Sequence, residues 1–135
     1  MRMDDYALRT EVRRMIAWSP AACLYDEVFR LLVDARDCLA TTTLQQNGRL
    51  GWSFVIESGR LTARLTDMTA WVLGHIAVER GEIDLATCRC RYALEARPIH
   101  LVPLADGDRH GLPPKMALLL DRSLGLYQRI ARLDQ

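Results

Sequence analysis

The stretch from Trp52 to Arg80 constrains the fold most, because its apolar residues repeat with the spacing of an α-helix. At about 100° per residue, five of them fall within roughly 80° of each other; they are Leu61, Leu65, Met68, Val72 and Ile76. A second, smaller stripe of Ala70, Leu73 and Ala77 lies on the opposite side. Apolar stripes on two sides are typical of a helix packed against more than one neighbour. The sequence therefore predicts one long central helix, with Gly81 as the left-handed residue after its end.

The remaining face of this helix combines charges with a large aromatic side chain. Arg60, Arg64, Asp67 and His75 share it, and Trp71 lies among them. One interpretation is that Trp71 is ordinary core, since large aromatics are mostly buried. The other is that the face is an interface with a second subunit or a partner, because Trp and Arg dominate the binding energy of such surfaces. On that interpretation, these five residues form a partner-binding site.

Two further segments have strong helical spacing. Ser19-Pro20 is a helix-start signal, and the chain from there to about Thr41 is amphipathic, with a mainly acidic outer face. Thr41-Thr42-Thr43 and Asn47-Gly48 then disfavour helix. Near the end of the chain, Leu112-Pro113-Pro114 begins a last helix with a regular apolar stripe.

The intervening and terminal segments are less regular. Asp84 is placed to cap a third helix that ends near Arg97, and residues 98–112 are expected to form a loop. Residues 1–18 are expected to be either a short helix or a mobile arm. No repeat and no internal boundary divides the chain, so residues 1–135 form a single domain. The predicted fold is all-α, a three- to four-helix bundle with one long central helix.

Composition and cysteine usage limit the classes of function. A net charge of +1, from 18 basic and 17 acidic residues, argues against wholesale binding to a nucleic-acid backbone, though not against a local basic patch. No apolar run is long enough to span a membrane, and the N-terminus lacks the apolar region of a signal peptide, so we expect a cytoplasmic protein. Cys23, Cys38, Cys88 and Cys90 are expected to be free thiols, since Cys88 and Cys90 lack the spacing of a zinc motif. We expect no metal and no cofactor.

Catalytic motifs are missing from the sequence, and one binding motif is present in outline. There is no glycine-rich phosphate loop, no nucleophile elbow and no paired carboxylate–histidine helix motif, so we expect a protein that is not an enzyme. The long helix, the turn from Gly81 to Asp84 and the third helix together have the outline of a helix-turn-helix. Arg89, Arg91 and Arg97 could then contact DNA. A small DNA-binding regulator is therefore the alternative function.

The segment from Ser58 to Glu82 resembles the signature of the RcdA-like family of alpha-proteobacteria, named for regulator of CtrA degradation. That signature is roughly S-x-R-L-T-T-R-L-M-Q-x-A-S-W-L-L-x-Q-R-A-V-x-x-G-E. This chain differs at Ala70, where the family has Ser, and at His75-Ile76, where it has Gln-Arg. Segments starting at Leu24 and Ser123 also fit, so the resemblance covers residues 24–134.

The resemblance implies a helical bundle that acts by contact with other proteins. It implies a homodimer without catalysis, serving as an adaptor or scaffold in regulated proteolysis. Such an adaptor, together with a response regulator, brings cell-cycle regulators to the ClpXP protease. The expected partners are therefore ClpX and a response regulator, with no membrane and no nucleic acid involved.

Overall fold

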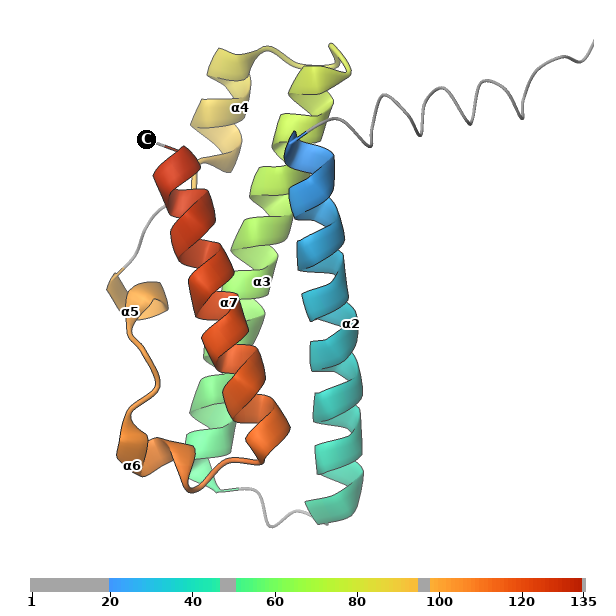
Figure 1. Cartoon of the computed structure of the whole chain (residues 1–135). Helices are drawn as coiled ribbons and strands as arrows, with labels where there is room; N and C mark the ends of the chain where they lie inside the picture. Colours follow the sequence, from blue (N-terminus) through green and yellow to red (C-terminus); the bar gives the residue numbers. More distant parts are fainter. Residues whose placement is uncertain (1–19, 47–50, 95–97, 135) are drawn as a thin grey trace, which may run out of the picture.

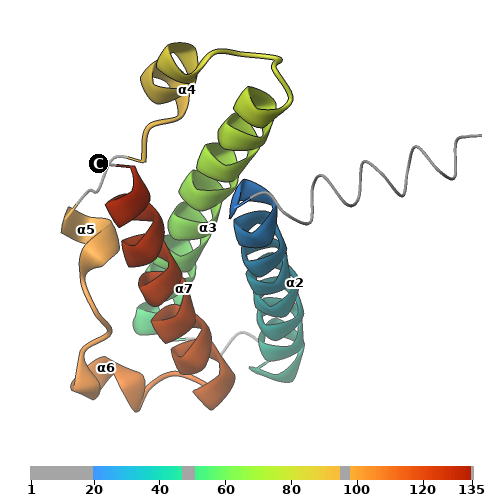
Figure 2. The ribbon, with the colours of Figure 1, turned by 45° about the horizontal axis from the view of Figure 1, so that its top comes forward.

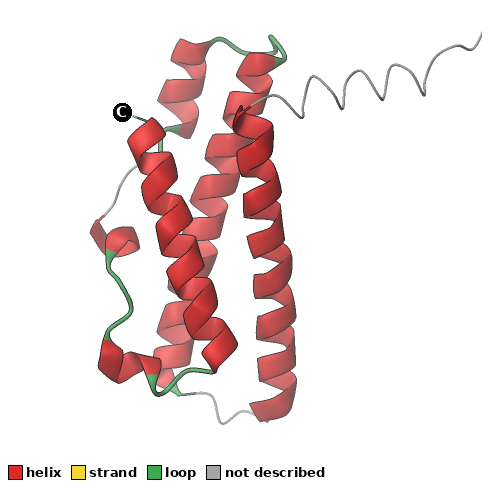
Figure 3. Ribbon diagram, viewed as in Figure 1, coloured by secondary structure: helices red, strands yellow, loops and turns green. Residues whose placement is uncertain are grey.

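The computed structural model describes residues 20–46, 51–94 and 98–134. Three long helices dominate the fold: α2 (Pro20–Gln46), α3 (Trp52–Glu79) and α7 (Pro114–Leu133). Three short ones, α4 (Leu85–Tyr92), α5 (Pro98–Leu101) and α6 (Asp106–Arg109), lie between α3 and α7 in the chain. The described residues contain helices and loops only, which confirms the predicted all-α class (Figure 3). The expected arm at residues 1–18 lies outside the described residues.

Helix α3 is the central element, as its sequence predicts. It packs against α2, α7, α4 and α5, and α2 also packs against α7 (Figures 1 and 2). The predicted seam supplies the core, since Leu61, Leu65, Met68 and Val72 are buried. On the opposite stripe, Leu73 is half exposed and lies outside the core, whereas Ala70 and Ala77 are half-buried. No helix in the described part of the chain is long and apolar enough to cross a bilayer.

The end of α3 and the start of α4 form where the sequence places them. Gly81 follows the end of α3 with φ +73°, a backbone conformation that glycine adopts without a steric penalty. Asp84 then caps α4, and its carboxylate accepts a hydrogen bond from the Thr87 backbone N–H at 2.6 Å. This bond lowers the pKa of Asp84. The tight turn between these residues directs α4 back against the last turns of α3 (Figure 2).

Two predicted helix ends were wrong. Helix α2 continues past Thr41 to Gln46, because Thr42 is buried and its hydroxyl lies 4.0 Å from the Cys38 sulfur. Burial of one face thus overrides the weak helix propensity of the threonine run. Helix α4 stops at Tyr92 and not near Arg97, since Ala93 has extended backbone with ψ 133°.

The prediction of a plain loop at residues 98–112 was also wrong, since α5 and α6 each form a single turn there. Pro98 begins α5, and Asp106 and Asp108 lie in the first turn of α6, where negative charge is favoured. Both turns lie on the side of α7 away from α2 (Figures 1 and 2). Arg109 fastens α6 to α7 through two hydrogen bonds to the Asp121 carboxylate, at 2.9 and 3.0 Å.

Candidate functional site

The five residues predicted to bind a partner lie on the face of α3 that the chain between α4 and α7 covers. Arg64 and Trp71 are buried there, and Arg60, Asp67 and His75 are half-buried. The expectation that these side chains share an exposed surface is therefore wrong for Arg64 and Trp71. The physical reason is that His100 and Val102 lie over this face at Arg64, and that Asp134 contacts it at Trp71.

Arg64 donates hydrogen bonds to backbone oxygens at and just after α5. Its guanidinium donates to the carbonyls of His100 at 2.8 Å and Val102 at 2.9 Å. It also donates to two oxygens of α7, the Leu120 carbonyl at 3.3 Å and the Ser123 hydroxyl at 3.2 Å. Burial lowers the pKa of Arg64, and the nearby charge of Arg60 lowers it further. The guanidinium stays charged because arginine does not lose its proton in proteins.

Asp67 holds the same segment from its side chain. Its carboxylate lies 3.0 Å from Nδ1 of His100, a buried residue of α5. The Tyr127 hydroxyl of α7 lies 3.4 Å from the same nitrogen, and the two rings meet edge to face. Asp67 thus contacts the ring of His100, and Arg64 donates a hydrogen bond to the backbone carbonyl of the same residue.

Trp71 is core with one polar contact at its edge, as the first interpretation held. Its indole Nε1 donates to Asp134 Oδ1 at 2.8 Å, and the Leu94 backbone N–H donates to the other carboxylate oxygen at 2.9 Å. His75 lies against the indole, with ring centroids 3.9 Å apart. Burial lowers the pKa of His75 and outweighs the attraction of Asp134. The ring is therefore neutral at pH 7.

Arg60 is the remaining member of the predicted site, and it is occupied by an ion pair. It contacts the buried carboxylate of Glu57 at 3.1 Å, one helical turn earlier. Both residues line a small groove that Val102 and Pro103 also line. Of the five predicted residues, none presents a free charge at an open surface.

Two groups of exposed apolar side chains offer a surface that the sequence reasoning missed. The first, here called the Phe29 patch, consists of Tyr25 and Phe29 on α2, which are 38% and 51% exposed. The two rings stack 6.0 Å apart. The sequence does contain a signal for this patch, because Tyr25 and Phe29 lie one helical turn apart and outside the apolar seam of α2.

The second group, here called the Trp52 patch, lies at the start of α3. Trp52, Val55 and Ile56 are 77%, 52% and 46% exposed. Because α2 and α3 are antiparallel, this patch is at the opposite end of the helix pair from the Phe29 patch (Figure 1). Exposed large apolar side chains that gather in one place mark surfaces for protein contact.

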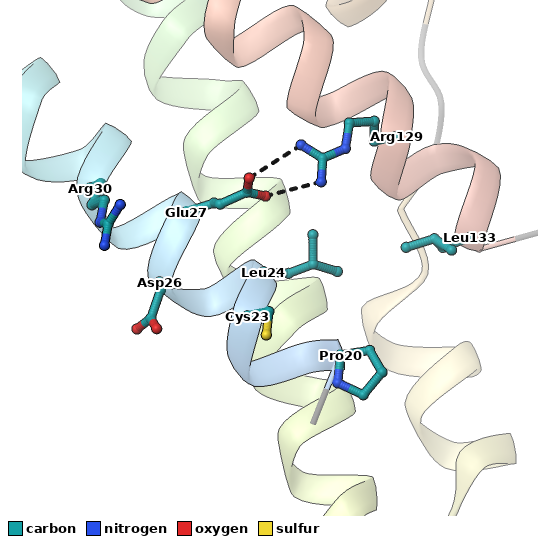
Figure 4. Close-up of a pocket in the computed structure, with 8 residues that line it drawn as sticks. All are labelled: Pro20, Cys23, Leu24, Asp26, Glu27, Arg30, Arg129 and Leu133. Atoms are coloured by element: carbon teal, nitrogen blue, oxygen red, sulfur yellow. Dashed lines mark hydrogen bonds and ion pairs between the residues drawn. The ribbon is translucent and has the colours of Figure 1, made fainter. Parts of the chain in front are cut away.

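A polar groove runs along the other side of α2, where it meets α7. Its two adjoining lobes, of about 500 and 550 Å³, share Glu27, Arg30 and Arg129. Glu27 reaches across it to Arg129 at 3.2 Å, and Leu24 and Leu133 lie beside this bridge (Figure 4). Arg122 forms a second bridge to Asp34 at 2.9 Å. We call this feature the α2–α7 groove.

The chemistry-bearing side chains are dispersed. In residues 20–46, 51–94 and 98–134, no three His, Cys, Asp or Glu side chains come together as metal ligands. Cys88 is buried against α3, and burial raises the pKa of its thiol, which makes it a poor nucleophile at pH 7. Cys23 and Cys90 are exposed at different places on the molecule, on α2 and α4.

Fold and surface together define a helical-bundle protein with exposed apolar patches on its long helices. The chain belongs to the family described as protein of unknown function DUF1465, whose model matches residues 13–135. Neither the curated proteins nor the solved structures include a significant match to it.

Proposed function

We propose that this protein is a non-enzymatic adaptor that joins two other proteins through separate surfaces. The observation that carries the proposal is the pair of exposed apolar patches at opposite ends of the α2–α3 pair. An adaptor must hold two partners at once, and patches so placed let two partners bind without collision. Tethering then raises the effective concentration of one partner at the other.

The resemblance to the RcdA-like family gives the proposal its particular form. The adaptor would deliver cell-cycle regulators to the ClpXP protease in the cytoplasm, with a response regulator as co-factor of delivery. A homodimer belongs to the same proposal. The site proposed here differs from the predicted one, because Arg64 and Trp71 serve the fold and the Phe29 and Trp52 patches take their place.

The test measures binding of purified ClpX to the immobilised protein. If either patch is the docking surface, Phe29→Ala or Trp52→Ala should weaken binding about 30-fold, since truncating a central aromatic costs on the order of 2 kcal/mol. Leu118→Ala is the matched control, because Leu118 is an apolar residue on α7 whose 60% exposure lies between those of Phe29 and Trp52. Retention of full affinity in both patch variants, or no binding by the unaltered protein, would contradict the proposal.

DNA binding remains the second candidate, because Arg80, Arg89 and Arg91 are exposed around the turn between α3 and α4. Arg97, the third arginine of the predicted recognition helix, lies outside the described residues. If this arrangement reads DNA, a mobility shift should weaken with salt, and each arginine removed should lower the slope of log affinity against log salt by about one. Absence of a shift at moderate salt would rule out this candidate.

A further inference from the structure

We propose that the α2–α7 groove binds an acidic, extended peptide segment of a partner protein. This inference does not depend on the adaptor proposal, since no residue of the Phe29 or Trp52 patch lines the groove. Three features of the groove support it: the charge of the walls, two arginines that are available to a ligand, and the shape of the floor.

The walls of the groove carry an excess of positive charge. Four arginines line it, Arg30 from α2 and Arg122, Arg129 and Arg132 from α7, against the carboxylates of Asp26 and Glu27 in the lining and of Asp34, which pairs with Arg122. The whole chain has a net charge of only +1. The excess at the groove is therefore local, and it favours a ligand with carboxylates along its length.

Two of these arginines are available to a ligand. Among the described residues, no carboxylate forms an ion pair with Arg30 or Arg132, and both side chains are exposed. The other two form the bridges Arg129–Glu27 and Arg122–Asp34, in which each side chain is about half exposed. Exposed pairs of this kind contribute little to stability, so ligand carboxylates can replace Glu27 and Asp34 at small cost.

The floor of the groove suits the apolar side chains of a peptide. Gly125 of α7 lines the groove, and a Cβ built there would meet nothing within 4 Å. Leu24 and Leu126 are buried beneath the opening, and Leu133 is exposed at one end. A matching ligand presents carboxylates to the arginines of the walls and apolar side chains to the floor. An extended peptide that alternates acidic and apolar residues can do this, because successive residues of an extended segment point to opposite sides.

A nucleic acid fits these walls less well. A phosphodiester backbone carries one charge per nucleotide on each strand, and Asp26 and Glu27 would face that charge in the groove. A peptide can place its carboxylates only at the arginines. The same experiment separates the two ligands.

The test titrates the full protein into a fluorescein-labelled ten-residue peptide of alternating Glu and Leu and follows anisotropy at low salt. Arg30→Ala/Arg132→Ala should weaken binding about tenfold, the effect of losing two exposed ion pairs. Arg36→Ala/Arg80→Ala is the matched control, because it removes the same charge from exposed positions outside the groove. A Lys/Leu peptide of the same length should not bind.

A second variant tests the floor independently of charge. Gly125→Leu places a side chain in open space, so the helical spectrum should be retained while peptide affinity falls at least tenfold. The proposal is overturned if the unaltered protein does not bind the Glu/Leu peptide, or if the groove and control variants bind it equally. Tighter binding of a single-stranded oligonucleotide than of the peptide, lost in the groove variant, would also overturn it.

Discussion

Arg64 is the largest fully buried side chain among the described residues, and it carries a charge. Burying a cation without partners is very costly, and here four oxygen atoms surround it. Two of these oxygens are the backbone carbonyls of His100 and Val102. They belong to a segment whose only helical structure is the single turn of α5. Arg64 thus satisfies backbone groups that regular secondary structure would otherwise satisfy.

Replacement of Arg64 by Met should therefore destabilise the fold strongly. The variant keeps an unbranched apolar stem in the buried site but leaves the His100 and Val102 carbonyls without a donor. We expect the free energy of unfolding in urea to fall by about 2–4 kcal/mol, because each orphaned buried group costs on the order of 1–3 kcal/mol. Arg36→Met, at an exposed position of α2, should change it by less than about 0.5 kcal/mol. Similar values for the two variants would show that Arg64 does not support the fold.

The lowered pKa of His75 predicts how the free energy of unfolding depends on pH. Burial lowers its pKa in the folded protein below the ordinary value of 6.5, so the unfolded chain binds a proton more readily. The contribution of His75 is therefore fully present above pH 6.5 and is lost as the pH falls through 6.5 toward the folded pKa. The free energy of unfolding should drop more steeply between pH 7.5 and pH 5.5 in the unaltered protein than in His75→Phe, which keeps a ring against Trp71. Parallel curves would contradict the prediction.

At the scale of the elements, Gly74 sets how closely α4 approaches α3. A Cβ at Gly74 would meet the Tyr92 ring at 2.8 Å and the Cys88 sulfur at 3.1 Å. Gly74→Ala should therefore displace α4 and lower the free energy of unfolding by about 1–3 kcal/mol, the usual cost of overpacking. Gly59→Ala, on the same helix with nothing within 4 Å, should instead raise it by up to about 1 kcal/mol.

The reactivity of the Cys88 thiol checks the same prediction by a different measurement. In a background of Cys23→Ser/Cys90→Ser, which removes the two exposed thiols, Gly74→Ala should speed modification of Cys88. Gly59→Ala should leave the rate unchanged. Equal rates in both variants would mean that α4 keeps its place and only the Tyr92 ring moves aside.

The sequence predicts the long helices well and the short ones poorly, for a physical reason. Helices α3 and α7 bury continuous stripes over many turns, so periodicity alone identifies them. Helices α5 and α6 have four residues each, too few for any period to be visible. The end of α2 was missed because burial of Thr42, a tertiary effect, decides it.

The candidate site was predictable only in part, because each side chain depends on what covers it. The sequence identified the face with Arg60, Arg64, Asp67, Trp71 and His75 as unusual, and in the structure it carries polar contacts that hold His100 and Val102. Whether such a face is open or covered depends on a segment more than thirty residues later in the chain. No local sequence pattern predicts that the backbone carbonyls of His100 and Val102 accept hydrogen bonds from Arg64.

At the scale of the whole molecule, Asp134 joins three parts of the chain. Asp134 is the first residue after α7, and its carboxylate accepts hydrogen bonds from the Trp71 side chain of α3 and from the Leu94 backbone N–H just beyond α4. Asp134→Ala should lower the free energy of unfolding by about 2–4 kcal/mol, since both bonds involve a charged group. Arg132→Ala, two residues earlier and exposed, is the control. An equal small effect in both would show that this end of the molecule is held by packing alone.

The oxygen shell of Arg64 resembles the coordination sphere of a structural cation. Small domains often use bound calcium to collect oxygen ligands from chain segments that would not otherwise stay together. Here the cation is covalently part of α3, and its ligands come from the α5 region and from α7. Arg64 therefore takes the place of a structural metal ion in this protein. Because it is covalently part of the chain, a chelator cannot remove it. Only a disturbance of α3 itself, or of its packing on α7, would release the segment that it holds.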